Sequence, residues 1–273
     1  MTGSGITADW SRMDPDGLLI NAFTPSPLPA VLILTPVKDA DPWIDGYFTR
    51  LFSLTYPHEL ISLGMLESDS RDATLDRASR NIHSDSNDFR RSTLWKKDFG
   101  YHIPDGKARH AGEIQAERRG VLAKSRNHLL FHALDDEDWV LWLDVDVIEY
   151  PSDLIERLMA TGKQIVQPHC VVEFGGHTFD LNGWRDKGKR HLDDLRQEGT
   201  FAKLHSVGGT VLWIDANVHR DGLIFPSFGY GQESAYVRTK AGEIETEGLG
   251  MMALDMGIEI WGMPHFEVRH RRG

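Results

Sequence analysis

Residues 31–67, VLILTPVKDADPWIDGYFTRLFSLTYPHELISLGMLE, predict a strand, a helix and a second strand. Residues 31–37 are apolar and rich in β-branched side chains, which is typical of a buried strand. Asp41 before Pro42 favours a helix start, and the apolar residues that follow recur at helical spacing: Ile44, Tyr47, Phe48 and Leu51. Residues 59–67 form the second strand. A βαβ unit joins parallel strands, so the sequence predicts a parallel sheet.

The rest of the chain continues this alternation. Beyond the unit, we expect helices at 120–134, 152–162 and 246–257, and strands at 139–151, 164–174, 206–218 and 258–264. Residues 68–119 are mostly polar and predict loops around one strand-like stretch, 92–103. Residues 1–29 predict an irregular lead-in, and residues 30–273 a single α/β domain of the doubly wound, Rossmann-like type.

Composition limits the function classes. The chain has 273 residues and a formal net charge of -11, which argues against nucleic-acid binding. The single cysteine, Cys170, cannot form an internal disulfide, and we expect a buried thiol in a reducing compartment. No apolar run is long enough to span a membrane and no signal peptide is apparent, so we expect a soluble, cytoplasmic protein. The oligomeric state is left open.

Two carboxylates interrupt the apolar segment WVLWLDVDVIEYP, residues 139–151. In one continuous strand, Asp144 and Asp146 would point to the same side, because side chains alternate. Ligands of open α/β sheets bind at the carboxyl ends of strands, and paired carboxylates there suit Mg²⁺ or Mn²⁺. Alternatively, one aspartate caps a turn and the other pairs with a surface cation.

Arg126 lies in the apolar stripe of the helix predicted at 120–134. A guanidinium on a buried face needs an anionic partner. This partner is either a structural carboxylate or the phosphates of a metal-bound ligand, with Lys124, Arg118 and Arg119 nearby in the sequence. Carboxylates that bind a metal beside a basic helix suit a nucleotide-diphosphate leaving group, which indicates glycosyl transfer from a nucleotide sugar.

Five segments then resemble glycosyltransferase family 62, the fungal mannan-polymerase mannosyltransferases. They are WVLWLDVDVIEYP (139–151), SRNHLL (125–130), VGGTVLWIDANVHRDGLIFP (207–226), ETEGLGMMALDMG (245–257) and IWGMPHFEVRH (260–270). The resemblance implies a GT-A glycosyltransferase fold, a Rossmann-like mixed sheet flanked by helices. It also implies GDP-mannose as donor, Mn²⁺ (or Mg²⁺) as cofactor, and retention of configuration to form an α-mannoside. Members of the family are typically Golgi proteins with an N-terminal membrane anchor, which this sequence does not show.

The resemblance assigns metal and donor residues. The metal ligands would be Asp144, Asp146 and His270, with His265 as a competing candidate for the third position. The donor nucleotide would contact Thr35, Pro36, Lys38, Glu67, Asp69, Arg126 and Asp144. Turn chemistry is the alternative explanation for the residues that follow the first two strands.

The resemblance also suggests catalytic and acceptor residues. Glu245 and Glu247, with Arg126, would lie beside the transferred sugar, although carboxylates at a helix start also favour the helix dipole. Asp180 and Trp184 would form an acceptor platform, and Trp184 is equally compatible with a core position.

Three functional hypotheses follow. The first is a metal-dependent, retaining α-mannosyltransferase that moves mannose from GDP-mannose to a glycan or small hydroxyl acceptor. The second changes the donor to another nucleotide sugar, or the acceptor to a small molecule or lipid. The third is a non-catalytic subunit that keeps the fold. The combination of Asp144, Asp146, Arg126 and His270 favours the enzyme hypotheses over the third.

Overall fold

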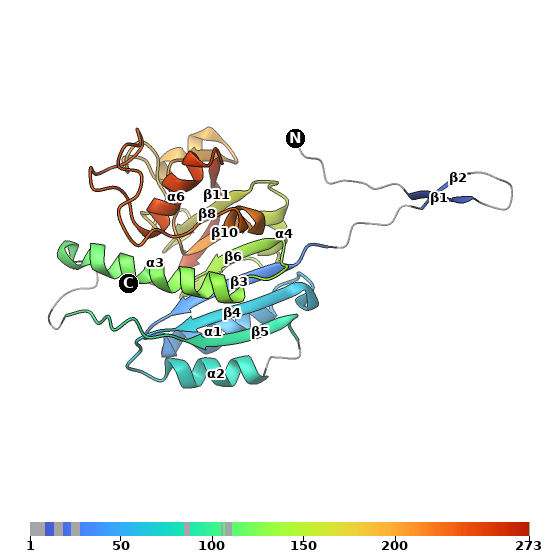
Figure 1. The fold of residues 1–273 in the computed structure, drawn as a ribbon, viewed down its shortest axis with the longest axis horizontal. Helices are drawn as coiled ribbons and strands as arrows, with labels where there is room; N and C mark the ends of the chain where they lie inside the picture. Colours follow the sequence, from blue (N-terminus) through green and yellow to red (C-terminus); the bar gives the residue numbers. More distant parts are fainter. Residues whose placement is uncertain are drawn as a thin grey trace.

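A nine-stranded mixed sheet forms the body of the computed structural model, which describes residues 9–13, 19–22, 28–84, 88–104, 106 and 111–272. The strand order is β5-β4-β3-β6-β10-β8-β11-β7, and β9 pairs with β11 (Figure 1). The strands are β3 Val31–Val37, β4 Ile61–Glu67, β5 Arg91–Lys96, β6 Trp139–Leu143, β7 Val147–Glu149, β8 Ile165–Val171, β9 Ala202–Leu204, β10 Val211–Asp215 and β11 Ile260–His270.

The predicted βαβ unit is confirmed. Strand β3 pairs in parallel with β4 on one side and with β6 on the other, and β4 pairs in parallel with β5. Strand β10 is antiparallel to both of its neighbours, which makes the sheet mixed rather than parallel throughout. Because β3, β4 and β6 are parallel, the residues that follow all three strands meet at the same edge of the sheet.

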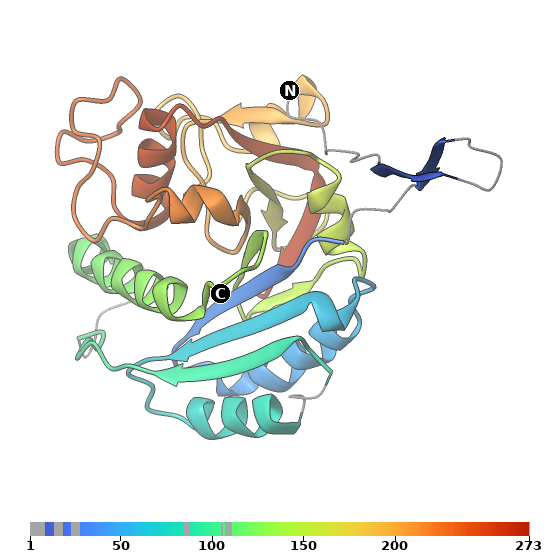
Figure 2. The same cartoon turned by 45° about the vertical axis from the view of Figure 1, so that its right-hand side comes forward.

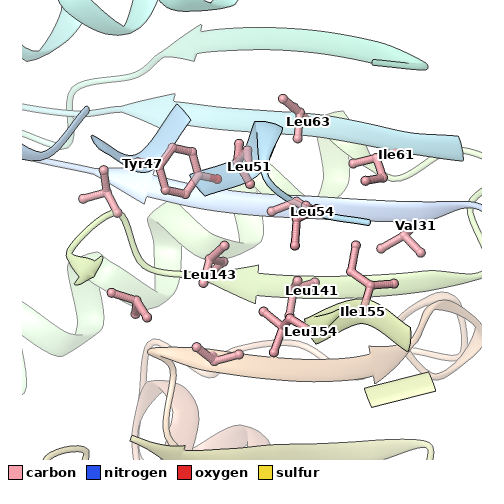
Figure 3. Packing of buried hydrophobic residues seen from close by; sticks show 14 of the residues in the cluster. Val31, Tyr47, Leu51, Leu54, Ile61, Leu63, Leu141, Leu143, Leu154 and Ile155 are labelled. Atoms are coloured by element: carbon pink, nitrogen blue, oxygen red, sulfur yellow. The ribbon is translucent and has the colours of Figure 1, made fainter. Parts of the chain in front are cut away.

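Helices cover both faces of the sheet (Figure 2). One face packs against α1 (Asp41–Phe52), α2 (Thr74–Ser84) and α4 (Leu154–Met159), and the other against α3 (Gly112–Ala133), α5 (Ala216–Arg220) and α6 (Glu245–Asp255). Two short 3₁₀ helices span His58–Leu60 and Asp193–Glu198. Strand alternation explains the two cores: Leu141 and Leu143 enter the first (Figure 3), and Val140 and Trp142 the second.

The prediction of one continuous strand over 139–151 was wrong. Strand β6 ends at Leu143, a turn follows in which the Val147 amide donates to the Asp144 carbonyl (3.2 Å), and β7 leaves to pair with β11. The two aspartates therefore do not share a strand face. A turn at the sheet edge avoids enclosing two adjacent carboxylates in the core, where their desolvation would be costly.

Several other boundaries differ from the predictions. Helix α2 was predicted as loop, because its only buried side chains are Thr74, Ala78 and Ile82 and its apolar stripe is narrow. Helix α3 begins at Gly112 rather than residue 120, and α4 spans 154–159 rather than 152–162. The lead-in predicted as irregular contains strands β1 (Asp9–Met13) and β2 (Leu19–Ala22), which pair antiparallel in a separate sheet. Its other residues before Leu28 lie outside the described part.

Two further observations concern composition. Cys170 is free and buried, as expected. Among the residues that the structure describes, every helix is too short or too polar to cross a bilayer.

His219 makes stability depend on pH. Its Nδ1–H donates to the Leu223 carbonyl (2.7 Å), and its Nε2 lies 3.4 Å from the indole nitrogen of Trp142, an arrangement that requires the neutral ring. Burial lowers the pKa of His219 to about 4. The unfolded chain therefore takes up this proton first as the pH falls, and stability that is present above about pH 6.5 is lost as the pH approaches the folded pKa.

Urea unfolding should detect this loss. Between about pH 7.5 and about pH 5, His219 alone should lower the free energy of unfolding by about 2 kcal/mol. A His219→Gln variant cannot titrate at this position, so its loss over the same interval should be smaller by that amount. Equal losses in both proteins would contradict the assignment.

Candidate active site

A pocket opens at the carboxyl edge of β3 and β6, against α3. The end of β3 contributes Pro36 and Val37, the loop after it contributes Lys38, Asp39 and Ala40, and α3 contributes Arg118, Val121, Leu122, Ser125 and Arg126. The other lining residues are Trp43, Ser68, Tyr101, Ile103, Asp144, Val145, Asp146 and Arg271. The turn that carries both aspartates therefore faces the basic helix across one cavity, at the sheet edge where the sequence predicted a ligand site.

The negative charge of Asp144 is only weakly compensated by nearby positive charge. Its side chain keeps 28% exposure, and its nearest cation is Arg126 Nη2, at 3.4 Å. Burial raises the pKa of Asp144 to about 7, although Arg126 opposes the shift. A carboxylate in this state gains from a nearby cation.

Asp146 is paired with two cations from the end of β11 and the residue after it. Its Oδ1 lies 3.0 Å from His270 Nε2, and its Oδ2 accepts from Arg271 Nε at 3.1 Å. Burial disfavours the charged form, but the hydrogen bonds from His270 and Arg271 hold the pKa of Asp146 below its usual range. The same pairing outweighs burial at His270 and raises the pKa of its imidazole.

The donor chemistry here fits a hard divalent cation. His270 Nδ1 lies 2.8 Å from the Arg271 carbonyl, which can only accept, so Nδ1 carries a proton and Nε2 faces Asp146. Histidines that bind metals commonly fix their second nitrogen in this way. The ring also stacks on Phe179, with centroids 4.0 Å apart.

The predicted metal ligands are brought together only in part. Asp146 and His270 are in contact, whereas Asp144 is paired with Arg126. Within the described ranges, no three His, Cys, Asp or Glu side chains are gathered as a metal-binding group. The competing candidate, His265, is exposed, contacts the Arg196 carbonyl and lines a different pocket, so it lies outside this site.

Arg126 shows features of both alternatives that the sequence left open, a structural carboxylate partner and an anionic ligand. It is 2% exposed, and its Nε lies 2.9 Å from Glu245 Oε1, so it has a structural carboxylate partner. Its Nη2 donates to the Gly209 carbonyl (3.2 Å), and the guanidinium packs near Trp142 and Phe225. Its Nη1, however, is buried without a hydrogen-bond partner. A buried donor of this kind, in a residue that lines the pocket, is suited to an anionic ligand.

Glu245 and Glu247 belong to a buried ion-pair chain. Its members alternate in charge in the order Glu243, Arg238, Glu247, Arg119, Glu245, Arg126 and Asp144. Glu247 also accepts a hydrogen bond from the Trp184 indole (2.7 Å), and burial raises its pKa. Neither carboxylate lines the pocket, and both lie in the first turn of α6, where the helix dipole favours negative charge. Both therefore act on Arg126 and its surroundings rather than on the pocket directly.

Glu245 also has an unusual backbone conformation. Its φ is +62°, a left-handed value that non-glycine residues adopt at a cost, and its amide donates to the Pro226 carbonyl (2.8 Å). The ion pairs with Arg126 and Arg119 hold this conformation in place.

Three residues that were predicted to contact the donor nucleotide bind other parts of the protein instead. Thr35 and Glu67 are buried and, like Asp69, do not line the pocket. Glu67 pairs with Lys96 at 2.8 Å. Asp69 accepts from the amides of Phe99 and Gly100, both at 2.9 Å, and so anchors the loop after β5. Pro36 and Lys38, in contrast, line the pocket as expected.

The predicted acceptor platform is also internal. Trp184 is completely buried, in agreement with the core alternative. Asp180 accepts three hydrogen bonds from the Gly209 and Thr210 amides and the Thr210 hydroxyl, which fixes the loop that touches Arg126. Of the helix cations, Arg118 lines the pocket, Arg119 is part of the ion-pair chain and Lys124 is exposed.

Sequence reasoning missed several lining residues. Trp43, Ser68 and Tyr101 carry no motif that separates them from ordinary core or loop residues. Arg271 had a usable signal, because it follows the proposed ligand His270 directly.

Thr35 stabilises the end of β6, directly before Asp144. Its hydroxyl donates to the Leu143 carbonyl (2.8 Å), the last residue before Asp144, and lies 2.6 Å from the Tyr47 hydroxyl. A Thr35→Val change would leave buried polar groups unpaired and should lower the free energy of unfolding by about 1–3 kcal/mol. Thr49→Val, on the exposed side of α1, is the control for urea unfolding. Equal stability of the two variants would contradict this role.

Comparison with known proteins places the chain in a family. The model of the Anp1 family matches residues 26–198, which include β3, β4, β6 and the aspartate turn. The chain belongs to the Anp1 family. It is 32% identical to the mannan polymerase complex subunit mnn9 of Schizosaccharomyces pombe, over 88% of this chain and 79% of that protein. It is 30% identical to the mannan polymerase II complex anp1 subunit of the same yeast, over 90% of this chain, and spans 64% of that subunit's length.

Solved structures of other proteins share the fold of this Anp1-family chain. The mannosyltransferase PcManGT from Pyrobaculum calidifontis, solved with GDP-Man and Mn²⁺, is 14% identical, with a TM-score of 0.55 over 97% of this chain and 59% of that one. GalNAc-T7, solved with UDP, GalNAc and Mn²⁺, is 10% identical, with a TM-score of 0.56 over 90% of this chain and 44% of that one. The chain has the GT-A glycosyltransferase fold.

Proposed function

We propose that this protein is a Mn²⁺-dependent glycosyltransferase that moves mannose from GDP-mannose to an acceptor hydroxyl, with retention, to form an α-mannoside. The observation that carries the proposal is the meeting of Asp144, Asp146 and Arg126 at one pocket, together with the unpartnered Nη1 of Arg126. The mannan polymerase relatives and the mannosyltransferase solved with GDP-Man and Mn²⁺ support the choice of sugar and nucleotide.

The residues of the chain have distinct tasks in this proposal. Arg126 binds the diphosphate and stabilises the charge that develops there as the glycosidic bond breaks. The guanidinium is held before the donor arrives by Glu245 and the Gly209 carbonyl, so little reorganisation is needed. Pro36, at the end of β3, and Lys38, directly after the strand, form the nucleotide side of the pocket.

Asp144, Asp146 and His270 would hold the divalent cation, which as a Lewis acid neutralises the diphosphate leaving group. Asp144 contributes a carboxylate whose burial favours a cation, and His270 contributes an imidazole already oriented by the Arg271 carbonyl. Mn²⁺ accepts both ligand types, and Mg²⁺ is the alternative ion.

Calorimetric titrations test the proposal. GDP should bind with Mn²⁺ present and at least about tenfold more weakly without it, and UDP should bind more weakly than GDP. Release of mannose from GDP-mannose, or its transfer to α-mannoside acceptors, then tests for catalysis, and the anomeric configuration of the product tests retention. Absence of any nucleotide binding would overturn the proposal. Tight binding without turnover, across a panel of acceptors, would favour the non-catalytic subunit.

A further inference from the structure

We infer that Arg271 is a diphosphate-binding residue. Without ligands its guanidinium is paired with Asp146, and it turns to the nucleoside diphosphate once a divalent cation binds Asp146. This inference rests on the proposed function and adds a ligand-binding residue to it. The structural basis is that Arg271 is paired with the proposed metal-binding carboxylate and lines the same pocket.

The guanidinium of Arg271 has few contacts that would prevent it from changing its orientation. Its Nε donates to Asp146 Oδ2 at 3.1 Å, and its Nη1 donates to the Arg272 carbonyl at 3.1 Å. The guanidinium lies over the Trp43 ring, 4.9 Å from its centroid, and the side chain is 26% exposed. Its Nη2 makes no hydrogen bond to any residue that the structure describes. A planar group stacked on an indole can turn in the plane of the ring without losing that contact.

The charges around Asp146 favour an exchange of partners. Its single negative charge is already shared by two partners, His270 on Oδ1 and Arg271 on Oδ2. A divalent ion bound to this carboxylate places two positive charges within a few ångströms of the guanidinium, and repulsion then weakens the Arg271 pair. A diphosphate on the same ion offers several anionic oxygens, and the forked guanidinium matches them better than it matches one shared carboxylate oxygen.

Arg126 shows what a permanently fixed arginine looks like in the same pocket. It is 2% exposed and is held by Glu245, Asp144 and the Gly209 carbonyl. Arg271 has one carboxylate partner and an open side. Arg126 is therefore in place before the nucleotide binds, and Arg271 joins it only after the metal and the nucleotide have bound.

Two titrations of the full chain test this inference. The first adds Mn²⁺ alone and follows free Mn²⁺ by electron paramagnetic resonance. The second adds GDP at saturating Mn²⁺ and measures heat, with guanosine as a ligand that lacks the diphosphate. The variants are Arg271→Gln and Arg271→Lys. The matched control is Arg272→Gln, which removes the same charge from the next residue, whose side chain is 76% exposed and pairs with Glu173.

The expected changes have opposite signs. Arg271→Gln removes a competitor for Asp146, so it should bind Mn²⁺ alone about threefold to tenfold more tightly. The same variant should bind GDP at saturating Mn²⁺ about tenfold or more weakly, with guanosine unaffected. Arg271→Lys should fall between Arg271→Gln and wild type, and Arg272→Gln should behave as wild type.

Equal GDP affinities for Arg271→Gln and Arg272→Gln would overturn the inference alone, provided that wild type binds Mn²⁺ and GDP. Weaker binding of both Mn²⁺ and GDP by Arg271→Gln would also overturn it, because that result indicates a structural role. Wild-type protein that binds neither ligand would overturn the proposed function and this inference with it. Thermal unfolding of each variant confirms that the comparison is between folded proteins.

Discussion

Replacing Arg126 with methionine should destabilise the protein by about 3–5 kcal/mol and weaken Mn²⁺-dependent GDP binding at least about tenfold. The change leaves Glu245, which is 2% exposed, without its closest cation, and removes the arginine that pairs with Asp144. Loss of the Nη1 donor removes the proposed diphosphate contact. Urea unfolding and calorimetry measure the two effects separately.

A second variant separates stability from function. Arg126→Met combined with Glu245→Gln removes the poorly compensated charge and should recover much of the lost stability, because the penalty lies mainly in a buried carboxylate that keeps only the more distant Arg119, at 3.8 Å. GDP binding should stay weak in this double variant. If nucleotide affinity returned together with stability, Arg126 would have only a structural role.

Replacing Asp146 with asparagine should abolish the Mn²⁺ dependence of GDP binding and reduce any sugar transfer at least about 100-fold. The shape of the side chain is kept, but a neutral amide replaces the carboxylate that contacts His270 and Arg271. Manganese titration followed by electron paramagnetic resonance measures the metal, and product formation from GDP-mannose measures transfer.

Asp153→Asn is a suitable control for this prediction. Asp153 is 44% exposed and pairs with Arg157 on the surface of α4, so its loss should leave metal binding and transfer unchanged. An Asp146→Asn protein that transferred the sugar at the wild-type rate would remove the metal role assigned to this carboxylate.

The core of the fold could be predicted from local patterns. Residues 31–37 and 61–67 are buried along their whole lengths apart from Pro36, and the helix between them buries its predicted stripe, because burial of a strand or helix face leaves a periodic record in the sequence. Helix α2 shows no clear pattern of this kind in its sequence, since little of its surface is buried.

The candidate site could be predicted only in part. Asp144, Asp146 and Arg126 were found because charges in apolar segments need a ligand or a partner. Asp180, Glu67 and Asp69 were assigned to ligands, yet they accept hydrogen bonds from Gly209, Lys96 and Phe99 respectively. A short acidic motif does not distinguish these uses, because the donors come from segments distant in sequence.

By itself the sequence determined the alternation of strands and helices, the net negative charge, and the presence of two close carboxylates and of an arginine in an apolar stripe, since each depends on composition or on neighbours within a few positions. Only the tertiary structure decided that β6 ends before Asp144, that Glu245 and Glu247 bind arginines, and that Arg271 reaches Asp146. These outcomes depend on which charged groups the folded sheet brings within contact distance, and no periodicity encodes that distance.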